Sequence, residues 1–197
     1  MSDTLGPHYL QDSIASLNAY KKQADKAIAQ LKDDEFFITL DEEANSVAII
    51  MKHMAGNMLS RWTNFLTTDG EKPNRNRDME FVVDSTTTRD QVMDYWEKGW
   101  RCVFEALEPL KSEDLERKVM IRGEAHTVMQ AINRQLMHYA NHIGQIIFLA
   151  KHFRATEWQS LSIPRNRSAE FTNRVQTKAG AANTEHRFEA IDRTKEN

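Results

Sequence analysis

Three histidines are the residues of this chain whose types and spacing best suit chemistry. His138 and His142 are four residues apart, so on an α-helix their imidazoles project from one face, with Cβ atoms about 5–6 Å apart. Two imidazoles placed in this way can bind one metal ion. If His53 supplies a third nitrogen from a separate helix, the ion keeps at least one open coordination position. That arrangement is typical of a catalytic metal site rather than of a closed structural one.

The spacing alone is weak evidence for a metal site. Seven histidines in 197 residues would place two of them four residues apart by chance about 0.2 times per chain. Two histidines on a helix face that bond only to neighbouring groups or to water therefore remain an alternative. A bundle with no metal at all remains open on the same grounds.

Composition narrows the classes of protein to consider. The single cysteine, Cys102, excludes an internal disulfide and a Cys-x-x-Cys zinc site, so any metal would have nitrogen or oxygen ligands. A net charge of −3 and a pI near 6.2 argue against a nucleic-acid-binding function, which needs a concentrated basic surface. The sequence has neither a recognisable secretion signal nor a run of eighteen apolar residues. We therefore expect a soluble cytoplasmic protein that binds neither nucleic acid nor membranes.

Apolar residues recur with a helical period in four long segments and with a strand period in none of substantial length. The expected helices cover residues 5–31, 46–66, 89–110 and 127–152. Four amphipathic helices of these lengths can bury their apolar faces by packing together, so the fold class we predict is all-α, a four-helix bundle.

Residues between these helices indicate where the helices begin and what the connections are. Asn45 is a candidate N-cap for the second helix, and Thr88 with Gln91 forms a capping-box pattern at the start of the third. Residues 67–88 contain Gly70, Pro73 and many polar side chains, which predicts a long loop after the second helix. Residues 114–127 predict a short extended connector or hairpin before the fourth helix.

The histidines lie on polar stripes of their helices. The stripe of His53 includes Asn57 and Ser60, and the stripe of His138 includes Gln135 and Gln145. We expect the two stripes to meet inside the bundle, where metal ligands from facing helices usually lie. These four polar residues are then candidates to hold the imidazole tautomers in place.

The C-terminal part of the chain loses its helical period after His152. We predict a domain covering residues 1–173 and a flexible C-terminal tail covering residues 174–197.

The order of the helices, with one histidine near the middle of the second and His-x-x-x-His in the fourth, resembles the DinB-like (YfiT-like) superfamily of bacterial four-helix proteins. Three stretches resemble a largely uncharacterised subfamily of that group more specifically: MKHMAGNMLSRWTNFLTTDGEKPNRNRD at 51–78, HYANHIGQIIFLAKH at 138–152 and LSIPRNRSAEFTN at 161–173. The metal triad of the superfamily corresponds to His53, His138 and His142 of this chain.

The resemblance implies a divalent metal ion as cofactor, with zinc first and nickel, manganese or iron as alternatives. It also implies a homodimer and, as in some relatives, the transfer of a low-molecular-weight thiol to an electrophilic substrate. Hydrolysis by a metal-bound water is a related alternative, and a non-catalytic metal-binding or stress-response protein is a third. No acidic residue on either histidine stripe stands out as a general base, which favours activation of a thiol over activation of water.

Overall fold

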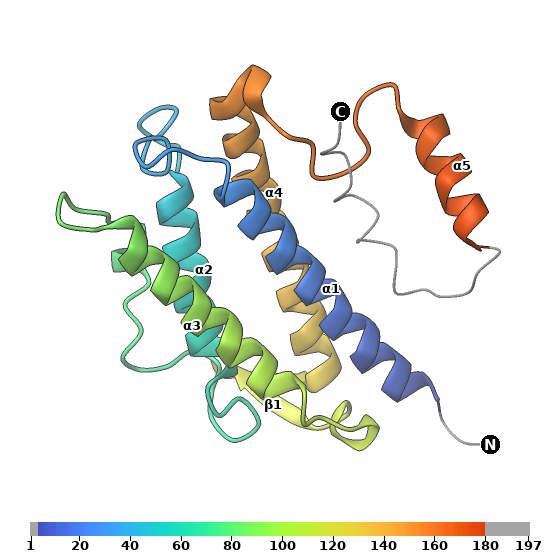
Figure 1. The fold of residues 1–197 in the computed structure, drawn as a ribbon. Coiled ribbons are helices and arrows are strands. Elements are labelled where there is room, and N and C mark those ends of the chain that lie inside the picture. The colour runs from blue at the N-terminus through green and yellow to red at the C-terminus, as the bar shows by residue number, and fades with distance from the viewer. Residues whose placement is uncertain (1–3, 180–197) are drawn as a thin grey trace. The chain divides into compact units, whose positions relative to one another are not determined.

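The computed structural model describes residues 4–179 of the chain, and four long helices dominate it (Figure 1). They are α1 (Leu5–Ile28), α2 (Val47–Trp62), α3 (Arg89–Leu107) and α4 (Val128–Arg154). All four belong to a compact unit that ends at Ala155. In this unit α1 packs beside α4, and α2 packs beside α3. The predicted all-α bundle is confirmed.

Side-chain caps fix where α2 and α3 begin. The Ser46 hydroxyl accepts a hydrogen bond from the Ile49 backbone N–H at 3.2 Å, so the N-cap of α2 is Ser46, and the prediction of Asn45 is wrong by one residue. At α3 the predicted capping box is present: the Thr88 hydroxyl accepts from the Gln91 backbone, and the Gln91 side chain accepts from the Thr88 backbone. Each cap satisfies backbone N–H groups that the first helical turn leaves without partners.

The connector before α4 is a hairpin of two short strands, as expected. Strand β1 (Lys118–Ile121) pairs antiparallel with β2 (Glu124–Thr127). The two residues between the strands, Arg122 and Gly123, both have positive φ angles, of 56° and 77°. This conformation is typical of tight two-residue hairpin turns, whose twist matches that of the strands. Thr127 ends β2 and also caps α4, in a capping box with Gln130, so the hairpin leads directly into the helix that carries two of the histidines.

The contact between α2 and α3 is unusually close because of a glycine. A Cβ atom at Gly99 of α3 would lie 3.0 Å from the Ala55 Cα of α2, which is closer than normal packing allows. Trp96 and Trp100, on the same helix, are fully buried and pack edge to face, with ring centroids 5.5 Å apart. The close backbone approach packs α3 tightly against α2, while Trp96 donates to Asp25 of α1 at 2.9 Å and Trp100 packs on Tyr139 of α4.

The long loop after α2 is attached to the hairpin. The Gly70 backbone N–H donates to the Met120 carbonyl at 2.7 Å. The Asp69 carboxylate accepts from the backbone N–H groups of Arg122 and Gly123, both at 2.8 Å. Further along, this loop contains a short 3-10 helix, η1 (Asp78–Phe81), that packs on α2. Other 3-10 turns are η2 (Ser112–Asp114) and η3 (Ala155–Glu157).

A second unit begins at Thr156 and contains one further helix, α5 (Ser168–Ala179). This helix was not predicted, because the chain has no clear helical period after His152. The predicted boundary at residue 173 falls within α5, and most of the predicted flexible tail, residues 180–197, lies outside the described residues. The domain division therefore stays a prediction.

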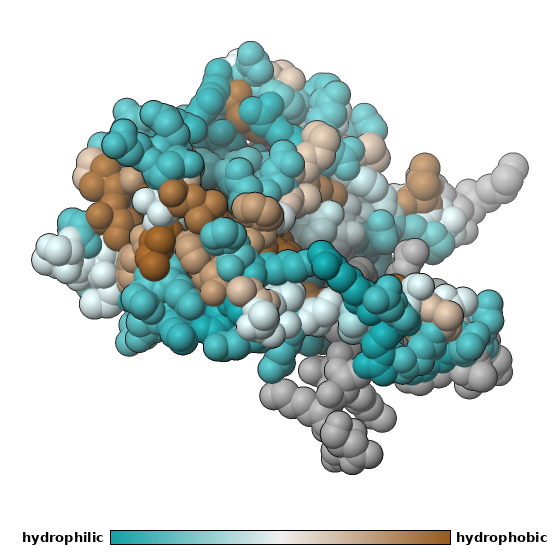
Figure 2. Space-filling model, turned by 90° about the horizontal axis from the view of Figure 1, so that it is seen from above, coloured by the Kyte–Doolittle hydropathy of each residue, from teal (hydrophilic) through white to brown (hydrophobic). Residues whose placement is uncertain are grey.

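The surface of the first unit is mostly polar, with a local apolar area. None of the described helices is long and apolar enough to cross a membrane. Figure 2 shows apolar residues gathered at one side of the end of the bundle where α2 begins. The segment that joins α1 to α2 lies at this end (Figure 1), and its exposed apolar side chains include Ile38 and Leu40, each 43% accessible.

Candidate metal centre

The structure brings the three predicted ligands together. His53 comes from α2, and His138 and His142 come from α4. Each offers a ring nitrogen, and these nitrogens all lie within 4.8 Å of one another. The His53 ring centroid is 5.5 Å from that of His138 and 5.0 Å from that of His142. The expected meeting of the two polar stripes is confirmed at these three residues, so the cluster could hold a metal ion.

The spacing of the nitrogens fits a small divalent cation. Zinc–nitrogen bonds of about 2.0–2.1 Å at tetrahedral angles place nitrogen ligands about 3.3 Å apart. The Nε2 atoms of His138 and His142 are already 3.1 Å apart. The separations in the cluster extend to 4.8 Å, about 1.5 Å beyond this spacing.

Two of the imidazoles are held in the tautomer that a metal ligand needs. His53 Nδ1 donates to Glu80 Oε2 at 2.9 Å, and His142 Nδ1 donates to Gln145 Oε1 at 2.8 Å. Because both oxygens accept, the hydrogen of each neutral ring lies on Nδ1. The lone pair is then on Nε2, the nitrogen available to an ion.

The two histidines of α4 are poor bases in this environment. Burial lowers the pKa of His138 from 6.5 to about 3, and the nearby His142 and His53 add to the shift. Burial also lowers the pKa of His142, although its hydrogen bond with Gln145 opposes the change. Both rings are therefore neutral near pH 7, the state in which imidazole binds metals. His138 Nδ1 is buried and has no hydrogen-bond partner among the described residues.

Glu80 of η1 is the residue of this site that sequence analysis missed. Its side chain is buried, with 7% of its surface accessible. One oxygen, Oε2, accepts from His53 and from Arg75 Nη2 at 2.9 Å, and the other accepts from Arg75 Nε at 2.8 Å. Burial by itself raises the pKa of Glu80, but the bonds with His53 and Arg75 outweigh it, so the pKa of this carboxyl is lowered overall. Glu80 is thus an ionised positioning residue from the loop, not from either histidine stripe.

A glycine makes room for this carboxylate. Gly56 lies on α2, three residues after His53, and a Cβ atom there would lie 2.7 Å from Glu80 Cδ. Any larger residue would push the carboxylate away from the imidazole. A glycine inside a helix costs about 1 kcal/mol relative to alanine, so Gly56 is the signal in the sequence that another group approaches α2 at this point.

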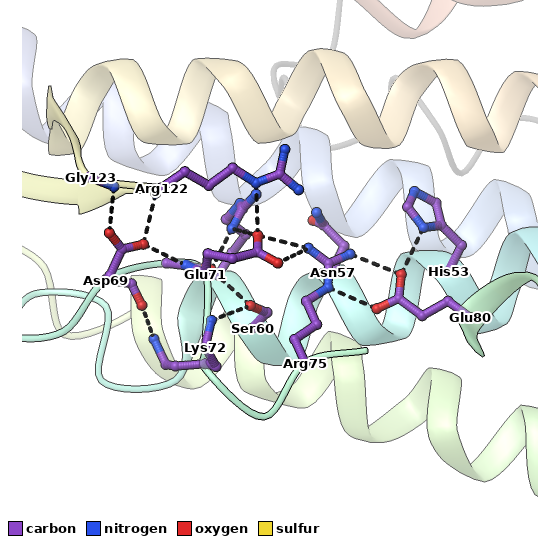
Figure 3. Close-up of polar contacts among 12 residues, drawn as sticks. His53, Asn57, Ser60, Asp69, Glu71, Lys72, Arg75, Glu80, Arg122 and Gly123 are labelled. Carbon is purple, nitrogen blue, oxygen red and sulfur yellow. Dashed lines mark hydrogen bonds and ion pairs between the residues drawn. The ribbon is translucent and has the colours of Figure 1, made fainter. Parts of the chain in front are cut away.

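Further ion pairs connect Glu80 to the hairpin (Figure 3). Glu71 Oε2 lies 3.2 Å from Arg75 Nη1, 3.0 Å from Arg61 Nη1 and 3.1 Å from Arg122 Nε. The side chains of Arg61 and Arg75 are almost completely buried. A continuous series of charged contacts therefore runs from the hairpin turn, through Glu71 and Arg75, to the imidazole of His53.

Only one of the four polar residues predicted to support the imidazoles does so. Gln145 contacts His142, as expected. Asn57 instead accepts from the Tyr139 hydroxyl at 3.4 Å, and Ser60 donates to the Gly70 carbonyl at 2.8 Å. Gln135 Oε1 is buried and has no partner among the described residues. The polar stripe of α2 thus serves mainly to hold the buried Tyr139 and the long loop.

Comparison with known proteins agrees with this architecture. The model of a family described as "Protein of unknown function (DUF1572)" matches residues 4–167. A solved structure described as that of the conserved protein of locus from Enterococcus faecalis is similar, with a TM-score of 0.55 and 17% identity. The match covers 77% of this chain and 96% of that chain, and at this identity it shows the fold alone. None of the curated proteins compared with this chain matches it.

Proposed function

We propose that this chain, which belongs to the DUF1572 family, binds a divalent metal ion through His53, His138 and His142. Zinc is the ion we prefer. One observation carries the proposal: nitrogens from two helices lie within 4.8 Å of one another, while hydrogen bonds at Nδ1 direct the Nε2 atoms of two of the rings to the cluster. Three neutral nitrogen ligands leave a coordination position for a substrate. Resemblance to the DinB-like superfamily at the same three residues supports this assignment.

The reaction we propose is the transfer of a low-molecular-weight thiol to an electrophilic substrate. A bound divalent cation would supply stabilisation of a thiolate or of a hydroxide. Among the described residues, Glu80 is the carboxylate that bonds to a histidine of the cluster, and both its oxygens are engaged by His53 and Arg75. It is therefore unsuited to take a proton from water as a general base, which favours thiol transfer over hydrolysis.

A non-catalytic metal-binding or stress-response protein is the second candidate. It is favoured by the position of the cluster, which lies where α2 meets α4, so that an ion there would also join two helices. Removal of the metal separates the two candidates. An open catalytic site predicts that the chelated protein keeps its helical circular dichroism, whereas an ion needed for folding predicts its loss.

The test of the proposed function is metal analysis of untagged protein, followed by activity assays. We expect about one zinc or similar ion per chain in the wild type and its loss in His142→Ala. His126→Ala is the matched control, because His126 lies on the hairpin outside the cluster, and it should keep the ion. A wild-type protein that binds no divalent ion would overturn the proposal. Bound metal without conjugation of small thiols to a generic electrophile would favour the non-catalytic candidate.

We also propose a homodimer, on the basis of the superfamily resemblance. Light scattering should then give twice the chain mass of 22.8 kDa. A mass equal to that of one chain across the concentrations used in the activity assay would exclude it.

A further inference from the structure

A second pocket lies beside the metal centre, along the face of α2 that the long loop covers. Its volume is about 620 Å³, within the range of small-molecule sites. On α2 its lining runs from Lys52 to Ser60, which corresponds to about 12 Å along the helix axis. Glu80 and Arg75 form part of its wall, but none of the three histidines lines it. The pocket is therefore a separate site that shares only a supporting wall with the metal centre.

The lining of this pocket is positively charged. Lys52 and Lys72 contribute positive charges to it, whereas the guanidinium of Arg75 and the carboxylate of Glu80 are paired with each other. The Glu80 carboxylate is already bonded to His53 and to Arg75, so little negative charge is left to face a ligand. Because the chain as a whole carries a net charge of −3, this positive lining is a local feature and not a reflection of overall composition.

Several hydrogen-bond donors of the lining remain available. Lys52 Nζ donates to the Val82 carbonyl at 2.5 Å, and Lys72 Nζ donates to the Asp69 carbonyl at 2.5 Å. An ammonium group has three hydrogens, so each lysine keeps donors for a ligand. The Tyr95 hydroxyl also lines the pocket and forms no hydrogen bond with another described residue. Amide groups add to these donors from Asn64, Asn74 and Asn76.

The two lysines lie towards opposite ends of the pocket. The Lys72 backbone N–H donates to Ser60 Oγ at 3.1 Å, which places Lys72 beside Ser60. Ser60 and Lys52 are eight residues apart on α2, about 12 Å along the axis. Between them the lining includes the apolar side chains of Leu59 and Met79. A ligand that fits this pattern has charged groups near both ends and a less polar middle.

We propose that this pocket binds an elongated small molecule with at least two anionic groups, carboxylates or phosphates. One anionic group lies near Lys52 and the other lies near Lys72. The ligand would not contact the proposed metal, because the lining contains none of the histidines. Its test can therefore succeed or fail separately from that of the metal centre.

Calorimetric titration with defined probes tests the proposal. The dipeptide glutamyl-glutamate carries several carboxylates along an extended backbone, and inorganic phosphate tests the phosphate alternative. Lysyl-lysine is a probe of similar size and opposite charge. The protein variants are the wild type, the double variant Lys52→Gln with Lys72→Gln, and Lys22→Gln. Lys22 is an exposed lysine on α1 outside the pocket, so its substitution changes the net charge without changing the lining.

We expect the wild type and Lys22→Gln to bind glutamyl-glutamate equally and the double variant to bind it about tenfold more weakly, because two partly screened ion pairs are lost. His142→Ala should still bind it, which excludes binding through the metal. Binding of phosphate without binding of glutamyl-glutamate would overturn the assignment of an elongated ligand with two anionic groups. Equal binding of lysyl-lysine, equal affinity in the double variant, or no binding of either anion would overturn the proposal.

Discussion

Replacement of Glu80 by glutamine tests whether this carboxylate positions His53. The two side chains have the same shape, but glutamine is neutral and has only one oxygen. In the wild type, the two oxygens accept from His53 Nδ1 at 2.9 Å and from Arg75 Nε at 2.8 Å. In Glu80→Gln one of these donors must face an amide NH₂ group, which cannot accept. The imidazole or the guanidinium therefore loses its partner.

The expected losses of metal affinity and of folding stability in Glu80→Gln follow from the burial of this ion pair. Groups that orient a metal-bound imidazole typically contribute 10–100-fold to metal affinity, about 1.4–2.8 kcal/mol. Removing one partner of a buried ion pair costs about 3–5 kcal/mol of stability, and the side chains of Arg75 and Glu80 are only 5% and 7% accessible. Since Arg75 keeps a second contact with Glu71 at 3.2 Å, we expect the lower end, about 3 kcal/mol.

The assay is competition for zinc against a chromophoric chelator, together with urea denaturation of each variant. Glu71→Gln is the matched control, because Glu71 forms ion pairs with Arg61, Arg75 and Arg122 but does not contact His53. It should lower stability and leave zinc affinity within about twofold of the wild type. If Glu80→Gln folds poorly, the double variant Arg75→Gln with Glu80→Gln removes the unpaired guanidinium as well. Wild-type zinc affinity in Glu80→Gln, or equal weakening in Glu71→Gln, would refute the reasoning.

Three further predictions concern pH and packing. The pKa of His138 in the folded chain, about 3, lies below its ordinary value of 6.5, so between these pH values the unfolded chain binds more protons than the folded chain. The contribution of the neutral His138 ring to the free energy of unfolding is therefore complete above pH 6.5 and is lost as the pH falls towards 3. In urea denaturation, the metal-free wild type should lose stability over this range more steeply than His138→Gln. The Tyr139 hydroxyl is fully buried and bonded to two side chains, so Tyr139→Phe should lower the free energy of unfolding by about 1–3 kcal/mol, and an unchanged value would contradict the bonding described. Gly99→Ala should destabilise by about 1–3 kcal/mol, because the added Cβ would lie 3.0 Å from the Ala55 backbone. Gly144→Ala, also in a helix but with open space around it, should instead stabilise by about 0.5–1 kcal/mol; equal effects of the two alanines would contradict the close approach.

The helices and the histidine cluster could be predicted because their signals are local. A helical period identifies the buried face of each segment, and His138 and His142 share a face through spacing alone. The capping box at Thr88 and the short connector or hairpin before α4 were predicted for the same reason, since each depends on residues within a few positions of one another. His53 could be added because the bundle leaves few ways for two polar stripes to be buried.

The support of the cluster could not be predicted in this way. Glu80 is 27 residues from His53 and reaches it from a loop, and no periodicity relates a loop residue to a helix face. Its path is set by backbone bonds between Gly70 and the hairpin and by buried ion pairs of Arg75, contacts between segments distant in sequence. The prediction that Asn57 supports an imidazole was wrong because it also ignored a contact between distant segments. Asn57 lies on the same stripe as His53, but its side-chain oxygen accepts a hydrogen bond from the hydroxyl of Tyr139 on the facing helix.

Because His53 is held by both a helix and a loop, metal binding and loop position should be coupled. An ion that binds His53 favours the state in which Glu80 and Arg75 are in place, and by linkage any ligand that stabilises this state raises the affinity for the ion by the same factor. Arg75 also lines the pocket proposed for anions. An anion that drew the guanidinium away from Glu80 would instead weaken metal binding. The sign of the coupling between the two sites therefore reports whether Arg75 keeps Glu80 as its partner when the pocket is filled.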